Sequence, residues 1–181
     1  YPAATRLLGV PSPDVPPVAS VGDLIFTPSD VAFTNPGAET GVVGWTTVSG
    51  LLSSFVAGDF PGQAPFQGAR FFGSNSPTCE ATQSLSASQS AELVSTNVTL
   101  GWRQAASASA GQARMGLRFY DDADVLISEQ FAPLETTTPT FGWVARSVSV
   151  VVPTLTDRID LVMQFIRVGA TADAFIDSIT L

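Results

Sequence analysis

The sequence predicts an all-β protein: a two-sheet antiparallel jelly-roll β-sandwich with an extended N-terminal arm. Short apolar runs alternate with polar positions at the two-residue period of a strand, and Gly, Pro, Ser, Asn and Asp separate these runs. No segment carries a helical stripe over three turns. Hydrophobic residues make up 45% of the 181 residues and charged residues only 13%, which indicates a folded chain with one sizeable core.

The arm is predicted at residues 1–30, and the jelly-roll β-sandwich at residues 31–181. Six prolines fall in the arm, at positions 2, 11, 13, 16, 17 and 28, and this density favours an extended chain over a helix. Two apolar spots, Leu7-Leu8 and Leu24-Ile25-Phe26, interrupt it, whereas a flexible linker would be more polar. We therefore expect the arm to dock, either on its own domain or on a neighbouring subunit.

The strands follow from the alternation. The clearest are expected at 68–73, 95–105, 113–120, 124–131, 144–152, 157–168 and 174–181, with weaker ones at 41–49 and 80–87. Residues 84–95 are ambiguous. Each clear strand has one apolar face and one mixed face, as in antiparallel sheets half-exposed to water. Asp121, Asp122 and Asp124 fall between two strands and predict a tight hairpin turn.

The last run, AFIDSITL, places a carboxylate in an apolar strand. A two-residue period puts Phe175, Asp177, Ile179 and Leu181 on one face. Because a buried, unpaired charge is costly, Asp177 needs a cation, a set of hydrogen bonds or a β-bulge that turns it outward.

Composition excludes several classes of function. The net charge is −8, every cation is Arg, and no basic cluster is visible, so nucleic acid and anionic membrane are poor partners. No apolar run reaches the roughly 18 residues of a membrane span. The absence of His excludes Ser-His-Asp and Cys-His catalysis and His-ligated zinc, and Cys79 has no second Cys with which to form a disulfide. We therefore expect no nucleic-acid partner, no membrane insertion and no enzyme activity.

Four stretches resemble carbohydrate-binding jelly-roll modules and their galactose-binding-like relatives. NPGAETGVVGWT (35–46) is similar to the opening signature of that family, and residues 97–126 and 141–167 are similar to its central strand pair and to its aromatic–strand–Val-Pro–Thr–strand segment. AFIDSITL resembles its closing strand. The resemblance covers about residues 33–181. The sequence departs from the family at Ala38, where a larger apolar residue is usual, and at Ser178, where a second Asp is usual.

The resemblance implies a structural calcium that ties the first strand to the last. The matching carboxylates are Glu39 and Asp177, with backbone help from Asn35 and Gly37. Calcium takes six to eight oxygen ligands, which carboxylates and turn carbonyls can provide. In the alternative interpretation, Asp177 accepts backbone N–H bonds or pairs with an Arg, while Glu39 is solvated.

The resemblance also implies a glycan as partner. Sugar sites in this fold combine an aromatic platform with planar polar groups. The candidate ligand-binding residues are Arg103, Arg118, Tyr120, Gln164, Phe60 and Phe66, with Arg114 and Gln63 beside them. Trp45 and Trp102 match family positions that face the core, and Trp143 is expected to pack as well. The alternative interpretation makes these residues ordinary solvated surface.

Two functions of different classes follow. The first is a non-catalytic module on an extracellular or virion surface that binds a glycan or cell-surface polysaccharide, as in adhesion. The second is a structural virion surface protein, either a capsid decoration or a fibre-associated domain, without a sugar ligand. There, residues 1–30 would attach the chain to other virion or surface proteins, or to further copies of itself in a lattice. The arm and the low charge favour the structural virion protein, and the resemblance favours the glycan-binding module.

Overall fold

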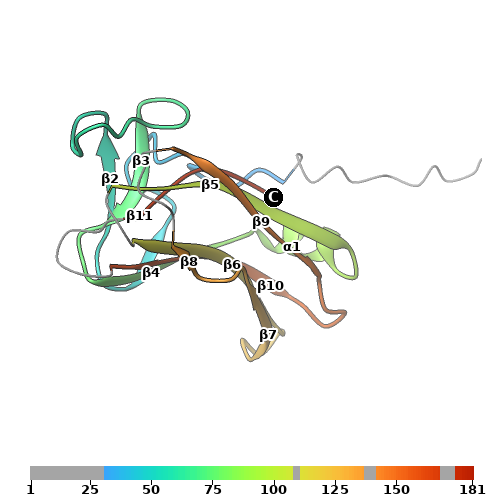
Figure 1. Cartoon of the computed structure of the whole chain (residues 1–181). Coiled ribbons are helices and arrows are strands. Elements are labelled where there is room, and N and C mark those ends of the chain that lie inside the picture. Colours follow the sequence, from blue (N-terminus) through green and yellow to red (C-terminus); the bar gives the residue numbers. More distant parts are fainter. Residues whose placement is uncertain (1–30, 108–110, 137–141, 168–173) are drawn as a thin grey trace, which may run out of the picture.

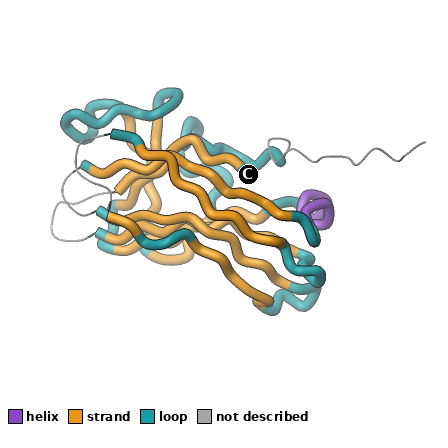
Figure 2. Tube along the Cα trace, turned by 45° about the vertical axis from the view of Figure 1, so that its right-hand side comes forward, coloured by secondary structure: helices purple, strands orange, loops and turns teal. Residues whose placement is uncertain are grey.

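The protein is a β-sandwich, as the sequence predicts. The computed structural model describes residues 31–107, 111–136, 142–167 and 174–181, and the predicted arm at 1–30 lies outside these ranges. Two antiparallel sheets lie one above the other in Figure 1, and the tube in Figure 2 shows that strands account for most of the described chain.

The elements follow the expected order. The strands are β1 (Thr46–Ser49), β2 (Leu52–Val56), β3 (Arg70–Ser74), β4 (Thr78–Ser84), β5 (Asn97–Ala106), β6 (Gln112–Tyr120), β7 (Leu126–Phe131), β8 (Glu135–Thr136), β9 (Val144–Val151), β10 (Arg158–Ile166) and β11 (Ala174–Thr180). One short helix, α1 (Ala87–Leu93), lies between β4 and β5.

The strand order brings distant parts of the sequence together. One sheet has the order β1-β4-β10-β6-β7, with β8 also pairing with β6, and the other has the order β2-β3-β11-β5-β9. The last strand, β11, therefore lies in the middle of the second sheet, between β3 and β5. Both of its neighbours are far away in sequence, so the sheet is complete only when β11 is in place.

The core lies between the two sheets, and the alternation predicted for β6 and β10 is confirmed. Met115, Leu117 and Phe119 of β6 point inward and are 0% exposed. Trp45 and Trp102 also lie in this core, as the resemblance implied. The side chains between the inward positions face outward, so the outer faces of both sheets carry the polar candidates.

The stretch whose sequence was ambiguous, residues 84–95, contains the helix α1. Ser86 caps this helix: its hydroxyl accepts from the backbone N–H of Gln89, and the Gln89 side chain accepts in return from the Ser86 N–H. The helix has seven residues and buries only Ser90 and Leu93, so it is too short to show a three-turn stripe. No helix within the described ranges is long and apolar enough to cross a membrane.

Two differences from the prediction lie near the start of the sandwich. The weak strand expected at 41–49 is reduced to β1, because residues 36–44 form successive turns. β2 was not predicted; its sequence, LSSFV, places two serines in the centre of the run and hides the alternation.

Candidate functional site

A β-bulge in β11 resolves the position of Asp177. The register with β5 shifts between Asp177 and Thr180, and Ser178 has a φ of 52°. Before the bulge, Asp177 lies on the outer side of the sheet; after it, Ile179 and Leu181 point into the core between the sheets. The two-residue period therefore holds only up to Asp177, and the expectation that Asp177 shares a face with Ile179 and Leu181 was wrong.

Hydrogen bonds accompany the bulge. Asp177 is 0% exposed. Its Oδ2 accepts hydrogen bonds from the backbone N–H groups of Phe66 at 2.8 Å and Gln67 at 3.1 Å. Its Oδ1 accepts a hydrogen bond from the backbone N–H of Ser178 at 2.7 Å. Burial raises the pKa of Asp177 to about 6, the three N–H donors act against this rise, and the nearby charge of Glu39 adds to it. One carboxylate thus fixes the conformation of the loop that precedes β3.

Glu39 binds the same loop from the other side. Its Oε1 accepts from the N–H groups of Ala69 at 3.0 Å and Arg70 at 3.1 Å, and its Oε2 accepts from that of Ala69 at 2.9 Å. A hollow of about 510 Å³ lies at the two carboxylates, and Asn35, Pro36, Gly37, Glu39, Thr40, Gln67, Gly68, Asp177, Ser178, Ile179 and Thr180 line it. The four residues predicted for calcium are therefore brought together.

The pair fits a hard cation in charge and in donor type. A Cβ on Gly37 would lie 3.1 Å from Asp177 Oδ1 and 4.0 Å from Glu39 Oε1, so the absent side chain leaves space between the two carboxylates. The Asn35 side chain is engaged in its own turn, where it donates to Gly41 O at 2.9 Å. Because no three His, Cys, Asp or Glu residues of the described chain gather as a metal site, backbone carbonyls would have to supply the remaining ligands.

A polar network crosses the outer face of the six-stranded sheet. Arg118 on β6 forms a bidentate pair with Glu80 on β4 at 2.7 and 3.1 Å, and it also donates to Glu129 on β7 at 3.0 Å. Gln164 on β10 donates to Glu80 at 2.6 Å and accepts from Arg114 Nε at 2.7 Å. The Arg118 contact, joined by Gln164, lowers the pKa of Glu80 below its ordinary value.

Phe131 forms the apolar part of this face. The guanidinium carbons of Arg114 and Arg118 lie 4.5 and 5.5 Å from its ring centroid. The ring occupies the space above Gly116, where a Cβ would lie 2.4 Å from Phe131 Cδ1. Phe131 was not among the residues predicted from the sequence. A glycine on the outward face in the middle of an otherwise regular strand is the feature that could have identified it.

Tyr120 lies at the end of the same face. The guanidinium of Arg158 lies 4.1 Å from the Tyr120 ring centroid, and Arg158 donates to Asp124 at 2.7 Å. Asp121 begins the turn between β6 and β7, where its Oδ1 accepts from the N–H groups of Ala123 and Val125. The acidic run is a hairpin turn, as predicted.

The other predicted ligand residues lie on the opposite side of the sandwich. Phe60 packs against Phe55 and Phe175 in a small aromatic cluster outside the five-stranded sheet. Phe66 lies against Arg103, whose guanidinium carbon is 4.4 Å from the ring centroid. The structure therefore divides the predicted set in two: Arg118, Tyr120 and Gln164 share one outer face, while Arg103, Phe60 and Phe66 share the other.

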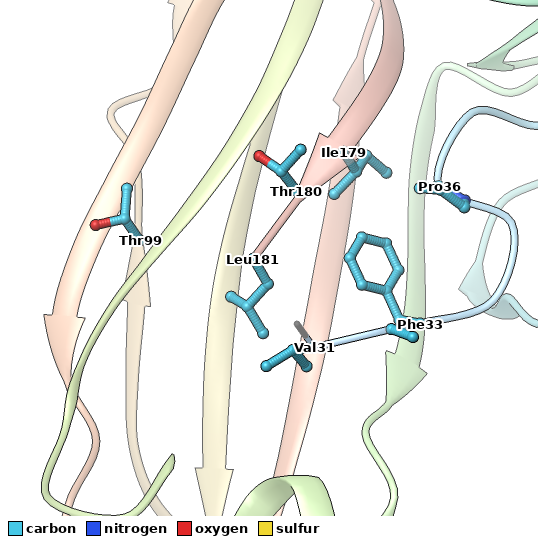
Figure 3. Close-up of a pocket in the computed structure, with 8 residues that line it drawn as sticks. Val31, Phe33, Pro36, Thr99, Ile179, Thr180 and Leu181 are labelled. Atoms are coloured by element: carbon cyan, nitrogen blue, oxygen red, sulfur yellow. The ribbon is translucent and has the colours of Figure 1, made fainter. Parts of the chain in front are cut away.

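A further hollow lies beside the end of β11, where Val31, Phe33, Pro36, Ile179 and Leu181 surround it (Figure 3). It measures about 600 Å³. Among the described residues that line it, the polar side chains are Thr99 and Thr180, and none is Arg, Asp, Glu, Asn or Gln. This hollow is therefore poorly equipped to orient the hydroxyls of a sugar.

Comparison with known proteins shows the fold. No family model and no curated protein sequence matches the chain. The solved structure of TmCBM61 in complex with β-1,4-galactotriose matches with a TM-score of 0.60 and 19% identity, over 82% of this chain and 94% of that one. A family 16 carbohydrate-binding module matches with a TM-score of 0.60 and 18% identity, over 82% and 96%.

A viral protein shares the architecture as well. The enzymatically active domain of tailspike protein 4 from bacteriophage CBA120 matches with a TM-score of 0.57 and 13% identity. The match covers 85% of this chain and 21% of the tailspike chain. The chain therefore has the β-sandwich fold of carbohydrate-binding modules, as the sequence resemblance implied.

Proposed function

We propose that this protein is a non-catalytic carbohydrate-binding module that binds a glycan on the outer face of its six-stranded sheet. The polar network of Arg114, Gln164, Glu80 and Arg118 is the observation that carries the proposal. It spans three neighbouring strands, and the fold likeness to carbohydrate-binding modules supports the same conclusion.

The chemistry of this face suits sugar hydroxyls. Guanidinium, carboxylate and amide groups offer donors and acceptors in fixed planes, as hydroxyl pairs require. Since these groups already hold one another in place, binding costs little further side-chain entropy. Phe131 places apolar area between the two arginines, against which the C–H groups of a sugar ring can pack. A glycan ligand in turn favours an extracellular or virion surface location.

Glycan binding can be tested directly. We expect the full chain to bind members of a glycan array, and Arg114→Ala to weaken that binding at least tenfold in calorimetric titration. Arg146→Ala is the matched control, because Arg146 lies on the other sheet and pairs with Glu135. A silent array at high protein concentration would remove the proposal, as would equal affinities of the two variants at unchanged melting temperature.

A structural virion role remains the second candidate. The fold likeness to a bacteriophage tailspike domain favours it, as does the proline-rich sequence of residues 1–30. In this role the arm attaches the chain to a particle. If a variant without residues 1–30 is incorporated into the particle to the same extent as the full chain, the arm is not the anchor.

We also propose that Glu39 and Asp177 hold a structural calcium. Two carboxylates border one hollow, Gly37 leaves space between them, and none of the described residues that line the hollow is an Arg. The cation would link the first turn, β11 and the loop before β3, so its role would be stability rather than ligand recognition.

A further inference from the structure

We propose a second ligand site, on the outer side of the five-stranded sheet, that binds a sugar carrying a carboxylate. Phe66, Arg103 and Trp143 form it, and we call these three residues the loop platform. The inference rests on the proposed function in one respect, namely that the fold binds sugars. The platform shares no residue with the network on the six-stranded sheet, so the two sites can be tested separately.

The platform is an exposed aromatic surface on a fixed base. Phe66 is 43% exposed, and the Arg103 guanidinium covers one side of its ring at 4.4 Å. The Trp143 ring meets that of Phe66 at 69°, with the centroids 6.5 Å apart. Trp143 Nε1 donates to Ala64 O at 2.9 Å, and Asp177 holds the backbone of Phe66.

Buried aromatic residues support the platform from below. Phe71 and Phe175 are 0% exposed, although they lie outside the main core. Trp143 packs edge-on against Phe71, with the ring centroids 5.9 Å apart. The loop is therefore packed on a small second core and bonded to β11, so the platform is formed before any ligand arrives.

Arg103 is a cation that has no polar partner among the described residues. Within the described part of the chain, its guanidinium contacts the Phe66 ring but forms no hydrogen bond or ion pair. Arg70, Arg114, Arg118, Arg146, Arg158 and Arg167 each bind an oxygen of the protein. Asp177 lies opposite Arg103 in the sheet register, but its oxygens accept from loop N–H groups. The N–H donors of Arg103 thus remain available.

Gln63 adds an acceptor beside the platform. It is 3% exposed, and its Nε2 donates to Ala64 O at 3.0 Å, the same carbonyl that Trp143 binds. Its Oε1 is buried and has no partner among the described residues. Because buried polar atoms are normally satisfied, this oxygen calls for a donor, which a buried water can supply.

These features select a carboxylated sugar. The planar fork of a guanidinium matches a carboxylate in two parallel hydrogen bonds, and Arg stacked on an aromatic ring keeps its outer N–H groups free for them. The apolar face of a sugar ring can pack against Phe66 and Trp143. Uronic acids and sialic acids share this combination of carboxylate and apolar ring face, so both belong to the proposed class.

Tryptophan fluorescence of the full chain can report binding, because Trp143 is half-exposed whereas Trp45 and Trp102 are buried at 7% and 3% exposure. The probes are trigalacturonate against neutral galactotriose, and 3′-sialyllactose against lactose. We expect at least one acidic probe to shift the emission and saturate, and to bind at least tenfold more tightly than its neutral counterpart. A preference for trigalacturonate over galactotriose identifies a uronic acid as the ligand, and a preference for 3′-sialyllactose over lactose identifies a sialic acid.

Variants separate the platform from the other face. We expect Arg103→Gln to weaken acidic binding at least tenfold, and Arg146→Gln, which removes the same charge elsewhere, to leave it unchanged. Wild-type affinity in Arg103→Gln, equal affinity for neutral probes, or no binding of either acidic probe would overturn the inference. If neutral glycan binding is lost in Arg114→Ala while no acidic probe binds the full chain, the proposed function stands and the platform is ruled out.

Discussion

Arg103 and Asp177 lie directly opposite each other on β5 and β11, yet they form no ion pair. The bulge at Ser178 and the loop before β3 take up the carboxylate, which accepts three backbone N–H groups instead. As a result one strand pair serves two purposes: the acid fixes the loop, and the guanidinium remains available beneath Phe66.

Asp177→Ala should destabilise the fold. It leaves the part-buried N–H groups of Phe66, Gln67 and Ser178 without their acceptor, and an unsatisfied donor costs roughly 1–3 kcal/mol when it is fully buried. Because the charged carboxylate itself costs free energy to bury, we expect a net loss of about 2 kcal/mol in urea unfolding. Asp122→Ala, at an exposed turn position, should change the free energy of unfolding by less than about 0.5 kcal/mol. Equal effects of the two substitutions would contradict the role given to Asp177.

Asp177 should also make stability depend on pH. Its folded pKa of about 6 lies above the ordinary value of 3.8, so between these values the folded protein holds a proton that the unfolded chain has lost. The contribution of Asp177 to the free energy of unfolding is therefore present below about pH 4 and is lost as pH rises through 6. Its upper limit is roughly 3 kcal/mol. With calcium chelated, the free energy of unfolding of wild type relative to Asp177→Asn should fall between pH 4.5 and 7.5. A constant difference would contradict the raised pKa.

Much of the fold could be predicted because the two-residue period survives in long strands such as β6 and β10. The period fails at Ser178, since nothing in AFIDSITL marks a residue with positive φ other than a small polar side chain. The sequence proposed candidate site residues by type but did not give their arrangement. Alternation shows that Arg103 and Arg118 point outward from their strands, but only the strand order places them on opposite sides of the sandwich. Phe131 escaped notice because its position depends on the space above Gly116.

Calcium should stabilise the domain through Glu39 and Asp177. Burial, with a further contribution from the charge of Glu39, raises the pKa of Asp177. A bound divalent ion favours the ionised carboxylates and so offsets both effects. We expect added calcium to raise the melting temperature of the full chain, and chelator to lower it, at pH 7.5. Glu39→Gln should abolish this response, whereas Asp122→Asn should retain it. An unchanged melting temperature with chelator and with added calcium ends the metal proposal.

Glu80 and Glu129 offer a matched pair around one arginine. Both bind Arg118, but the Glu80 side chain is 17% exposed and the Glu129 side chain 46%. We expect Glu80→Gln to cost roughly 1–3 kcal/mol in urea unfolding and Glu129→Gln less than about 1 kcal/mol, because exposed ion pairs contribute little. Since the pKa of Glu80 is lowered, its contribution is present above the unfolded pKa and is lost as pH falls through the folded pKa. Equal costs at pH 7 would show that burial does not distinguish the two pairs.

Gly116→Ala should displace Phe131 and thereby disturb the proposed glycan face. The new Cβ would lie 2.4 Å from Phe131 Cδ1 and 2.6 Å from Gln130 O, so both the ring and the β7 backbone must shift. Such overpacking typically costs about 1–3 kcal/mol. In a Phe131→Ala background the ring contact is gone and the backbone contact remains, so the cost of Gly116→Ala should become smaller without vanishing. A double-mutant cycle in urea measures this coupling, and glycan affinity should fall in each single variant. If Gly116→Ala costs the same in both backgrounds, the ring does not occupy the space above the glycine, and Phe131 is not the apolar centre of this face.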